Sequence, residues 1–266
     1  MYQFGFIGIG NMGGAMALAA VKTTEPRLIL VSAKHAERAQ AFAAKCGAVA
    51  ADNLTIASHA KFIVLGIKPQ FMAEVLHEIA PVLHKRKDFV LVTMAAGLTM
   101  ENIAEMAGGQ YPIIRIMPNT PSRVGQGVVQ YDANALVRGE DLEEFLACLA
   151  PAGLIDHLPE RLIDAGSAVS GCGPAFVSLF MEALADGGVA CGLPRDKALA
   201  YAAQTLLGTA QLYLESLSHP GILKDQVCSP GGSTIQGVRA LEVGGLRGTV
   251  MEAVIAAFEK NQSFIR

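Results

Sequence analysis

Three glycines near the N-terminus, Gly8, Gly10 and Gly13, have the spacing GxGxxG at the end of an apolar run at residues 3–9. In dinucleotide-binding folds the first glycine permits a tight turn, the second lets the backbone approach a pyrophosphate, and the third allows close contact between helix and strand. The following helix N-terminus offers free N–H groups to the phosphates. A glycine-rich turn without a ligand is the alternative, and the position between strand and helix favours the dinucleotide site.

The end of the second apolar run, at residues 28–32, bears on which dinucleotide would bind. An NAD-specific site carries Asp or Glu about 20 residues after the glycines, where it binds the ribose 2′-hydroxyl. Here the run ends in Ser32-Ala33-Lys34 instead. Ser32 can donate to a 2′-phosphate and Lys34 can neutralise it, so the sequence favours NADPH over NADH. An ordinary solvated loop is the alternative.

Three further turns follow predicted strands and carry small or rigid residues. They are Gly66–Pro69, in which Lys68 is the charged member, Ala95–Gly97, and Met117–Pro121. Ligands of open α/β sheets bind at the carboxyl ends of the strands. Each turn alone is unremarkable, but together they outline a crevice.

The second half of the chain has two glycine-rich segments. Ser170–Pro174 (SGCGP) interrupts a helical pattern, and its two glycines and proline are expected to break or kink the helix. Cys172 has no base nearby in the sequence, so we interpret it as structural and not as a nucleophile. Ser229–Thr234 (SPGGST) precedes a short helix, where free N–H groups and hydroxyls could bind a carboxylate or phosphate. A simple helix cap is the alternative there.

Strands and helices alternate in the first half of the chain, which indicates a parallel sheet covered on both faces. The predicted strands are 3–9, 28–32, 62–67, 89–95 and 113–118, and the predicted helices are 12–21, 36–47, 70–84 and 99–107. After residue 160 only helical patterns follow, at 161–190, 194–217 and 245–262, with short segments near 219–227 and 234–243. The fold class is therefore α/β: a Rossmann-type doubly wound parallel sheet (1–159) followed by an all-helical domain (160–266).

Composition restricts the partners. With 21 Lys+Arg against 24 Asp+Glu the net charge is −3, so we expect no nucleic-acid partner. Hydrophobic residues make up 52% of the chain and the mean hydropathy is +0.37, which favours burial of apolar surface between subunits. No run reaches the ~18 consecutive apolar residues of a membrane span, so no membrane partner is expected.

Cysteine and histidine usage indicates a cytoplasmic protein without a metal site. The five cysteines are scattered singly, with an odd count and no CxxC spacing, and the six histidines have no ligand spacing. Disulfide frameworks and zinc sites show other patterns.

Taken together, these motifs resemble the pyrroline-5-carboxylate reductase family over essentially the whole chain. The resemblance rests on GFIGIGNMG (5–13), IKP (67–69), MAAG (94–97), RIMPNTP (115–121), SGCGPAF (170–176), ALADGGVACGLPR (183–195) and above all HPGILKDQVCSPGGSTIQGVRALE (219–242). It implies reduction of the imine 1-pyrroline-5-carboxylate to L-proline, the last step of proline biosynthesis, by a nicotinamide cofactor, NADPH with NADH as the alternative.

The resemblance also implies the site residues and the assembly. By this correspondence the cofactor-binding residues are Ile7, Gly8, Ile9, Gly10, Asn11, Met12, Ser32, Lys34, Asn53, Gly66, Ile67, Lys68, Pro69, Met94, Ala95 and Ala96, and the substrate-binding residues are Ser170, Gly231, Gly232, Ser233 and Thr234. Thr234 corresponds to the catalytic Thr beside the imine nitrogen. The helical half of the family intertwines with a second subunit, which implies a homodimer, and many members form rings of dimers such as a decamer.

The chain departs from the family pattern at Cys172, where Ser is usual, at Ala33, often polar, and at Phe176, frequently Tyr. Ala33 weakens the NADPH assignment slightly. A β-hydroxyacid dehydrogenase shares the domain plan but would carry a Lys on the helix after the glycine turn, and residues 161–190 contain none. A dinucleotide-binding regulator without enzymatic activity is the other alternative; loss of the glycine loop or of SPGGST would indicate it, and both are intact.

Overall fold

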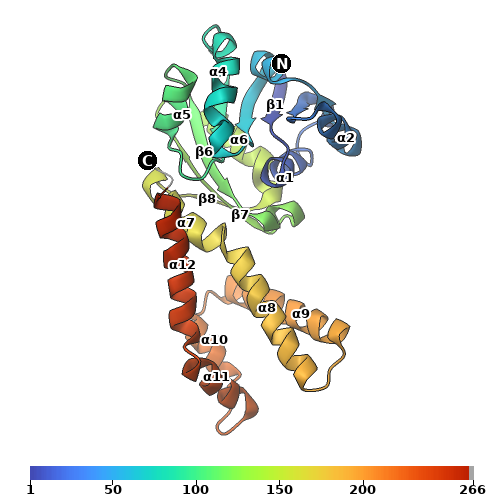
Figure 1. The fold of residues 1–266 in the computed structure, drawn as a ribbon, viewed down its shortest axis with the longest axis vertical. Coiled ribbons are helices and arrows are strands. Elements are labelled where there is room, and N and C mark those ends of the chain that lie inside the picture. The colour runs from blue at the N-terminus through green and yellow to red at the C-terminus, as the bar shows by residue number, and fades with distance from the viewer. Residues whose placement is uncertain (264–266) are drawn as a thin grey trace. The chain divides into compact units, whose positions relative to one another are not determined.

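The computed structural model describes residues 1–263, and the chain divides into two compact units that are described separately (Figure 1). The first unit is Met1–Gly171 together with the end of the chain from Ala257, and the second is Cys172–Ala256. The domain boundary expected between residues 159 and 160 stays a prediction. The helix Glu160–Ser170 (α7) belongs by its contacts to the first unit.

The first unit is built on one eight-stranded sheet with the order β3-β2-β1-β4-β5-β6-β7-β8. The strands are β1 (Tyr2–Ile7), β2 (Ile29–Ser32), β3 (Val49–Ala50), β4 (Ala60–Leu65), β5 (Val90–Thr93), β6 (Ile113–Pro118), β7 (Gly127–Ala133) and β8 (Gly153–His157). All neighbouring strands pair in parallel except β6 and β7, which are antiparallel. The Rossmann-type α/β class is confirmed, with β7 and β8 running opposite to the other six strands.

Helices cover both faces of this sheet. They are α1 (Asn11–Ala20), α2 (Ala36–Cys46), α3 (Asn53–His59), α4 (Met72–Leu83), α5 (Met100–Ala107) and α6 (Gly139–Leu149). Side chains alternate across the strands, so Phe4 and Phe6 of β1 join the core beneath α1 and α6, while Ile7 joins the core beneath α3, α4 and α5. Phe4 and Phe62 pack with ring centroids 5.2 Å apart in the first of these cores.

Five elements of this unit were not predicted: β3, β7, β8, α3 and α6. β3 has only two residues, and β8 is half exposed. β7 carries Gln130, Tyr131 and Asp132 in place of a continuous apolar run. Such strands lack the apolar signal by which a strand buried on both faces is recognised.

The second unit is helical, as predicted. It contains α8 (Gly173–Ala190), α9 (Arg195–Ser216), α10 (Pro220–Gln226), α11 (Ser233–Val243) and most of α12 (Leu246–Gln262). The predicted break at Ser170–Pro174 is confirmed, because α7 ends at Ser170 and α8 begins at Gly173.

This helical unit has hardly any core of its own. Among its described residues the buried apolar cluster consists of three alanines, Ala185, Ala198 and Ala202. Large apolar side chains lie exposed on the same helices, for example Leu179 (66%) and Leu214 (67%). Exposed apolar surface on this scale usually marks an interaction surface.

One stretch, residues 160–190, is long and apolar enough to cross a membrane, judged by length and composition alone. A single stretch of this kind is weak evidence for a span. The expected absence of a membrane partner therefore stays a prediction.

Candidate cofactor and substrate site

The turn after β1 depends on three glycines that meet backbone to backbone. A Cβ on Gly13 would lie 2.0 Å from the carbonyl oxygen of Gly8, and a Cβ on Gly66 would lie 2.2 Å from the same oxygen. Gly8 itself has a φ of +94°, a conformation that L side chains rarely adopt. The start of α1 can therefore approach the ends of β1 and β4 only because these three positions lack a side chain.

The second glycine of the motif, Gly10, is not packed against another element. A Cβ there would have no described atom within 4 Å, so the turn is open on that side. Gly10 is also the N-cap of α1 and has no capping side chain in the described chain. No capping side chain competes for the N–H groups of the first turn, and their predicted binding of a phosphate stays a prediction.

Beside this turn lies a pocket of about 520 Å³. It brings together six of the predicted cofactor residues, namely Ile7, Gly8, Ser32, Lys34, Asn53 and Ile67. Its wall is completed by residues that sequence analysis did not single out, among them Gln40, Asp52, Phe71, Glu74 and Glu78. The glutamates lie on α4, where no local sequence pattern distinguishes them from other solvated helix positions.

The polar contacts of this pocket link β2, α3 and α4. The Ser32 hydroxyl donates to Asn53 Oδ1 at 2.7 Å, and Asn53 Nδ2 donates to Glu78 Oε2 at 2.8 Å. Lys34 Nζ lies 5.6 Å from the ring centroid of Phe71, within the range of a cation–π contact. Hydrogen bonds from Thr55 hold the pKa of Asp52 below its usual range, so this carboxylate adds a negative charge to the wall.

Farther along the sheet, the turn Met94–Gly97 follows β5. The amide of Ala95 donates to the hydroxyl of the buried Thr93 at 3.3 Å. Thr99 then caps α5 in a reciprocal capping box with Asn102. These hydrogen bonds fix both ends of the turn.

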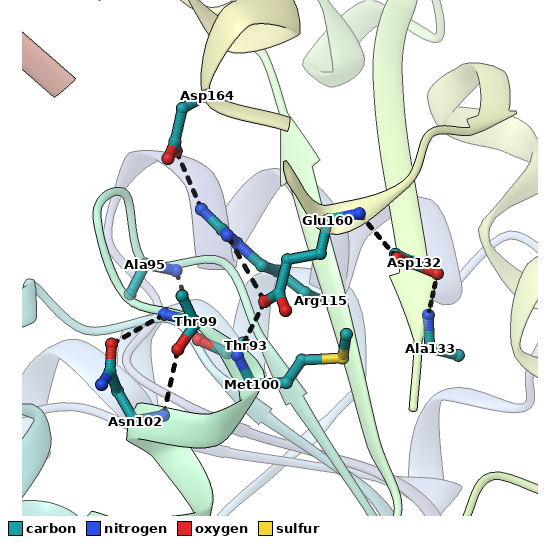
Figure 2. A network of polar contacts seen from close by, with 10 residues as sticks. All are labelled: Thr93, Ala95, Thr99, Met100, Asn102, Arg115, Asp132, Ala133, Glu160 and Asp164. Atoms are coloured by element: carbon teal, nitrogen blue, oxygen red, sulfur yellow. Dashed lines mark hydrogen bonds and ion pairs between the residues drawn. The ribbon is translucent and has the colours of Figure 1, made fainter. Parts of the chain in front are cut away.

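Arg115 on β6 is the centre of a polar network that fixes α7 against the sheet (Figure 2). Its guanidinium is 1% exposed, donates to Asp164 at 2.9 Å and contacts Glu160 at 3.4 Å. The Glu160 carboxylate also accepts from the Met100 amide at 2.7 Å, and the Glu160 amide donates to Asp132 at 2.6 Å. The network therefore joins α5, β6, β7 and α7.

The far end of α7 carries Ser170, a predicted substrate residue. Asn119, directly after β6, donates to the Ser170 carbonyl at 2.9 Å and accepts from the Val128 amide at 2.9 Å. Gln130 donates to the Ser170 hydroxyl at 3.1 Å. Ser170 therefore lies at the carboxyl end of β6, on the edge of the sheet where the cofactor turns also lie.

The predicted substrate loop, Ser229–Thr234, belongs to the second unit. Gly231 has a φ of +70°, and Gly232 is the N-cap of α11 without a capping side chain in the described chain. The first N–H groups of α11 and the exposed Thr234 are thus available to a ligand. The substrate role of this loop stays a prediction, as does that of Ser170. Within residues 1–263 no His, Cys, Asp and Glu side chains group as three or more metal ligands.

The fold and the glycine turn define a dinucleotide-binding oxidoreductase with a helical C-terminal half. A family model described as "Pyrroline-5-carboxylate reductase dimerisation" matches residues 160–264, and one described as "NADP oxidoreductase coenzyme F420-dependent" matches residues 3–97. Pyrroline-5-carboxylate reductases from Glycine max and Escherichia coli (strain K12) are each 40% identical over 98% of this chain, covering 95% and 97% of their own lengths.

A solved structure supports the same assignment. The pyrroline carboxylate reductase of Plasmodium falciparum with NADP bound has a TM-score of 0.90 and 32% identity, covering 100% of this chain and 98% of that one. The chain therefore belongs to the pyrroline-5-carboxylate reductase family. The resemblance inferred from its motifs is confirmed.

The Arg115 network predicts a large stability loss when its cation is removed. In Arg115→Met the Asp164 carboxylate, 7% exposed, loses its partner. Breaking a buried ion pair in this way costs about 3–5 kcal/mol, which urea unfolding would measure. Arg27→Met is the matched control, because the Arg27–Glu25 pair is exposed and its loss is expected to cost under ~1 kcal/mol. Equal losses in both variants would contradict the role given to Arg115.

Proposed function

We propose that this chain reduces 1-pyrroline-5-carboxylate to L-proline with NADPH, with NADH as the alternative donor. The observation that carries the proposal is the 40% identity to pyrroline-5-carboxylate reductases over nearly the full chain, joined to an intact glycine turn and SPGGST loop. The test is oxidation of NADPH by the full chain, followed at the nicotinamide absorbance with and without the imine, together with detection of proline as the product.

The proposed dinucleotide would occupy this pocket and the turns beside it. The open side of Gly10 and the uncapped N–H groups of α1 would hold the pyrophosphate, and Ser32 and Lys34, which line the pocket, would contact the adenosine ribose. When bound, the cofactor supplies the hydride. The turn Met94–Ala96 would lie against its ring, since the small side chains leave the backbone approachable.

Little acid–base machinery is needed for this reaction. An iminium carbon is already electrophilic, so the chain's contribution is mainly orientation. The amides of Gly231, Gly232 and Ser233 would hold the substrate carboxylate at the start of α11. Thr234 would bind the ring nitrogen and orient the carbon that accepts the hydride. Ser170, at the end of α7 in the first unit, is proposed as a further substrate-binding residue.

We further propose that the helical half, residues 160–266, forms a homodimer and that dimers assemble into a ring such as a decamer. The match of residues 160–264 to a dimerisation family and the exposed apolar helices support the dimer. The singly spaced cysteines support a cytoplasmic location, and the net charge of −3 argues against a nucleic-acid partner. The apolar surface of 160–190 would then contact another subunit and not a membrane.

The proposed role of Thr234 is tested by Thr234→Ala. Because the residue offers one oriented hydrogen bond and is not the proton source, kcat/KM should fall about 10- to 1000-fold without vanishing, equivalent to about 1.4–4 kcal/mol. NADPH affinity, measured by fluorescence titration, should hardly change. Full activity, or a parallel loss of NADPH binding, would show that the substrate site is misplaced.

The proposed role of Lys34 is tested by Lys34→Ala, with steady-state kinetics for both cofactors. The variant removes a cation that attracts the 2′-phosphate, so kcat/KM should fall more for NADPH than for NADH, by roughly tenfold in their ratio, which corresponds to 1.4 kcal/mol. Lys22→Ala, on a residue outside the pocket lining, is the control. Equal losses for the two cofactors would show that Lys34 does not bind the phosphate.

The proposed dimer predicts a mass of at least twice 27.9 kDa for the chain at micromolar concentration, measured by light scattering. Leu179→Glu on α8 should weaken the assembly, because it places a charge within the exposed apolar surface. Leu136→Glu, at a half-exposed position of the first unit, is the matched control and should not. An active monomer of the unaltered chain would contradict the proposal.

A further inference from the structure

The wall of the cofactor pocket contains a chain of hydrogen bonds that can run in only one direction. Glu78 presents a carboxylate, which accepts hydrogen bonds and donates none. The Asn53 group 2.8 Å from it is therefore the amide NH₂, which leaves the amide oxygen of Asn53 facing Ser32. That oxygen in turn requires the Ser32 hydroxyl to donate, at 2.7 Å.

This direction decides what Ser32 offers to a ligand. Its proton is engaged by Asn53, so only oxygen lone pairs remain for the pocket. A ribose hydroxyl can donate to those lone pairs. A phosphate dianion can only accept, so it could bind the Ser32 hydroxyl only by drawing that proton away from Asn53.

The acidic residues of the pocket also disfavour a 2′-phosphate. Lys34 is the basic residue of the wall, against the acidic Asp52, Glu74 and Glu78. Lys34 attracts a phosphate group bound beside Ser32. Glu78 repels it, because the carboxylate is only one side chain removed from Ser32 along the hydrogen-bond chain.

We propose that Glu78 is a specificity-determining residue of the cofactor site. Acting through Asn53, it directs the Ser32 hydroxyl away from the ligand and lowers the preference for a dinucleotide that carries a 2′-phosphate. The inference rests on the proposed function only in that the ligand of this pocket is a nicotinamide dinucleotide. Glu78 is a positioning residue here, since its effect reaches the ligand through Asn53 and Ser32.

Glu78→Gln tests this role by allowing the chain to reverse. The glutamine amide can donate to Asn53 Oδ1, Asn53 Nδ2 can then donate to Ser32, and the Ser32 hydroxyl is free to donate to a phosphate. Calorimetric titration of the full chain with adenosine 2′,5′-bisphosphate and with adenosine 5′-monophosphate measures the preference without any turnover. We expect the affinity ratio in favour of the 2′-phosphate to rise about tenfold.

Two further variants separate hydrogen-bond direction from charge. Glu74→Gln removes the same charge one helical turn earlier on α4, from a residue that lines the pocket and has no hydrogen bond to Asn53 in the described chain. In Glu74→Gln the affinity ratio in favour of the 2′-phosphate should rise twofold or less. In Ser32→Ala/Glu78→Gln the gain should disappear, because no hydroxyl remains to donate to the phosphate.

Three results would overturn the inference: an unchanged ratio in Glu78→Gln, an equal rise in Glu74→Gln, or a gain that survives the loss of the Ser32 hydroxyl. These outcomes are independent of the reductase reaction. An unaltered chain that binds both adenosine phosphates but turns over the imine with neither cofactor would contradict the proposed function instead, and would leave the binding ratios interpretable.

Discussion

The close approach of Gly8, Gly13 and Gly66 is the constraint on which the cofactor site depends. Side chains at Gly13 or Gly66 would place carbon within 2.2 Å of the Gly8 carbonyl, a contact that no rearrangement of a side chain relieves, because the opposing atom is backbone. This contact sets how near α1 comes to the ends of β1 and β4. The free N–H groups of α1 and the pocket beside them are consequences of that distance.

The buried Arg115 has a comparable role at the other end of the same sheet edge, where α7 packs against β6. A cation on a central strand would be costly alone, and two carboxylates from α7 compensate it. One of them, Glu160, also binds the first amide of α5. The turn after β5 and the helix that ends at Ser170 are thus held by one side chain, so a nicotinamide ring and a substrate residue would share a common support.

The parts of the candidate site that depend on local chemistry could be predicted from the sequence. The glycine turn follows the mostly apolar β1, and Ser32 and Lys34 lie at and just after the end of the buried β2, so motif and context agree there. Glu78 could not be found in this way, because it reaches the pocket only through the packing of α4 beside α3. β7 and β8 were missed because strands at a partly exposed edge of the sheet carry polar residues.

The helical unit, unlike the sheet, buries little apolar surface among its described residues. Its described buried cluster is three alanines, and side chains as large as Leu179 and Leu214 remain exposed. Helices of this kind gain most of their stability from tertiary or intersubunit packing of an apolar face. The loop before α11 can hold a substrate in a fixed orientation only if those helices are themselves fixed. Since hydride transfer to an imine depends mainly on orientation, assembly of the helical unit and activity of the proposed reductase should be coupled.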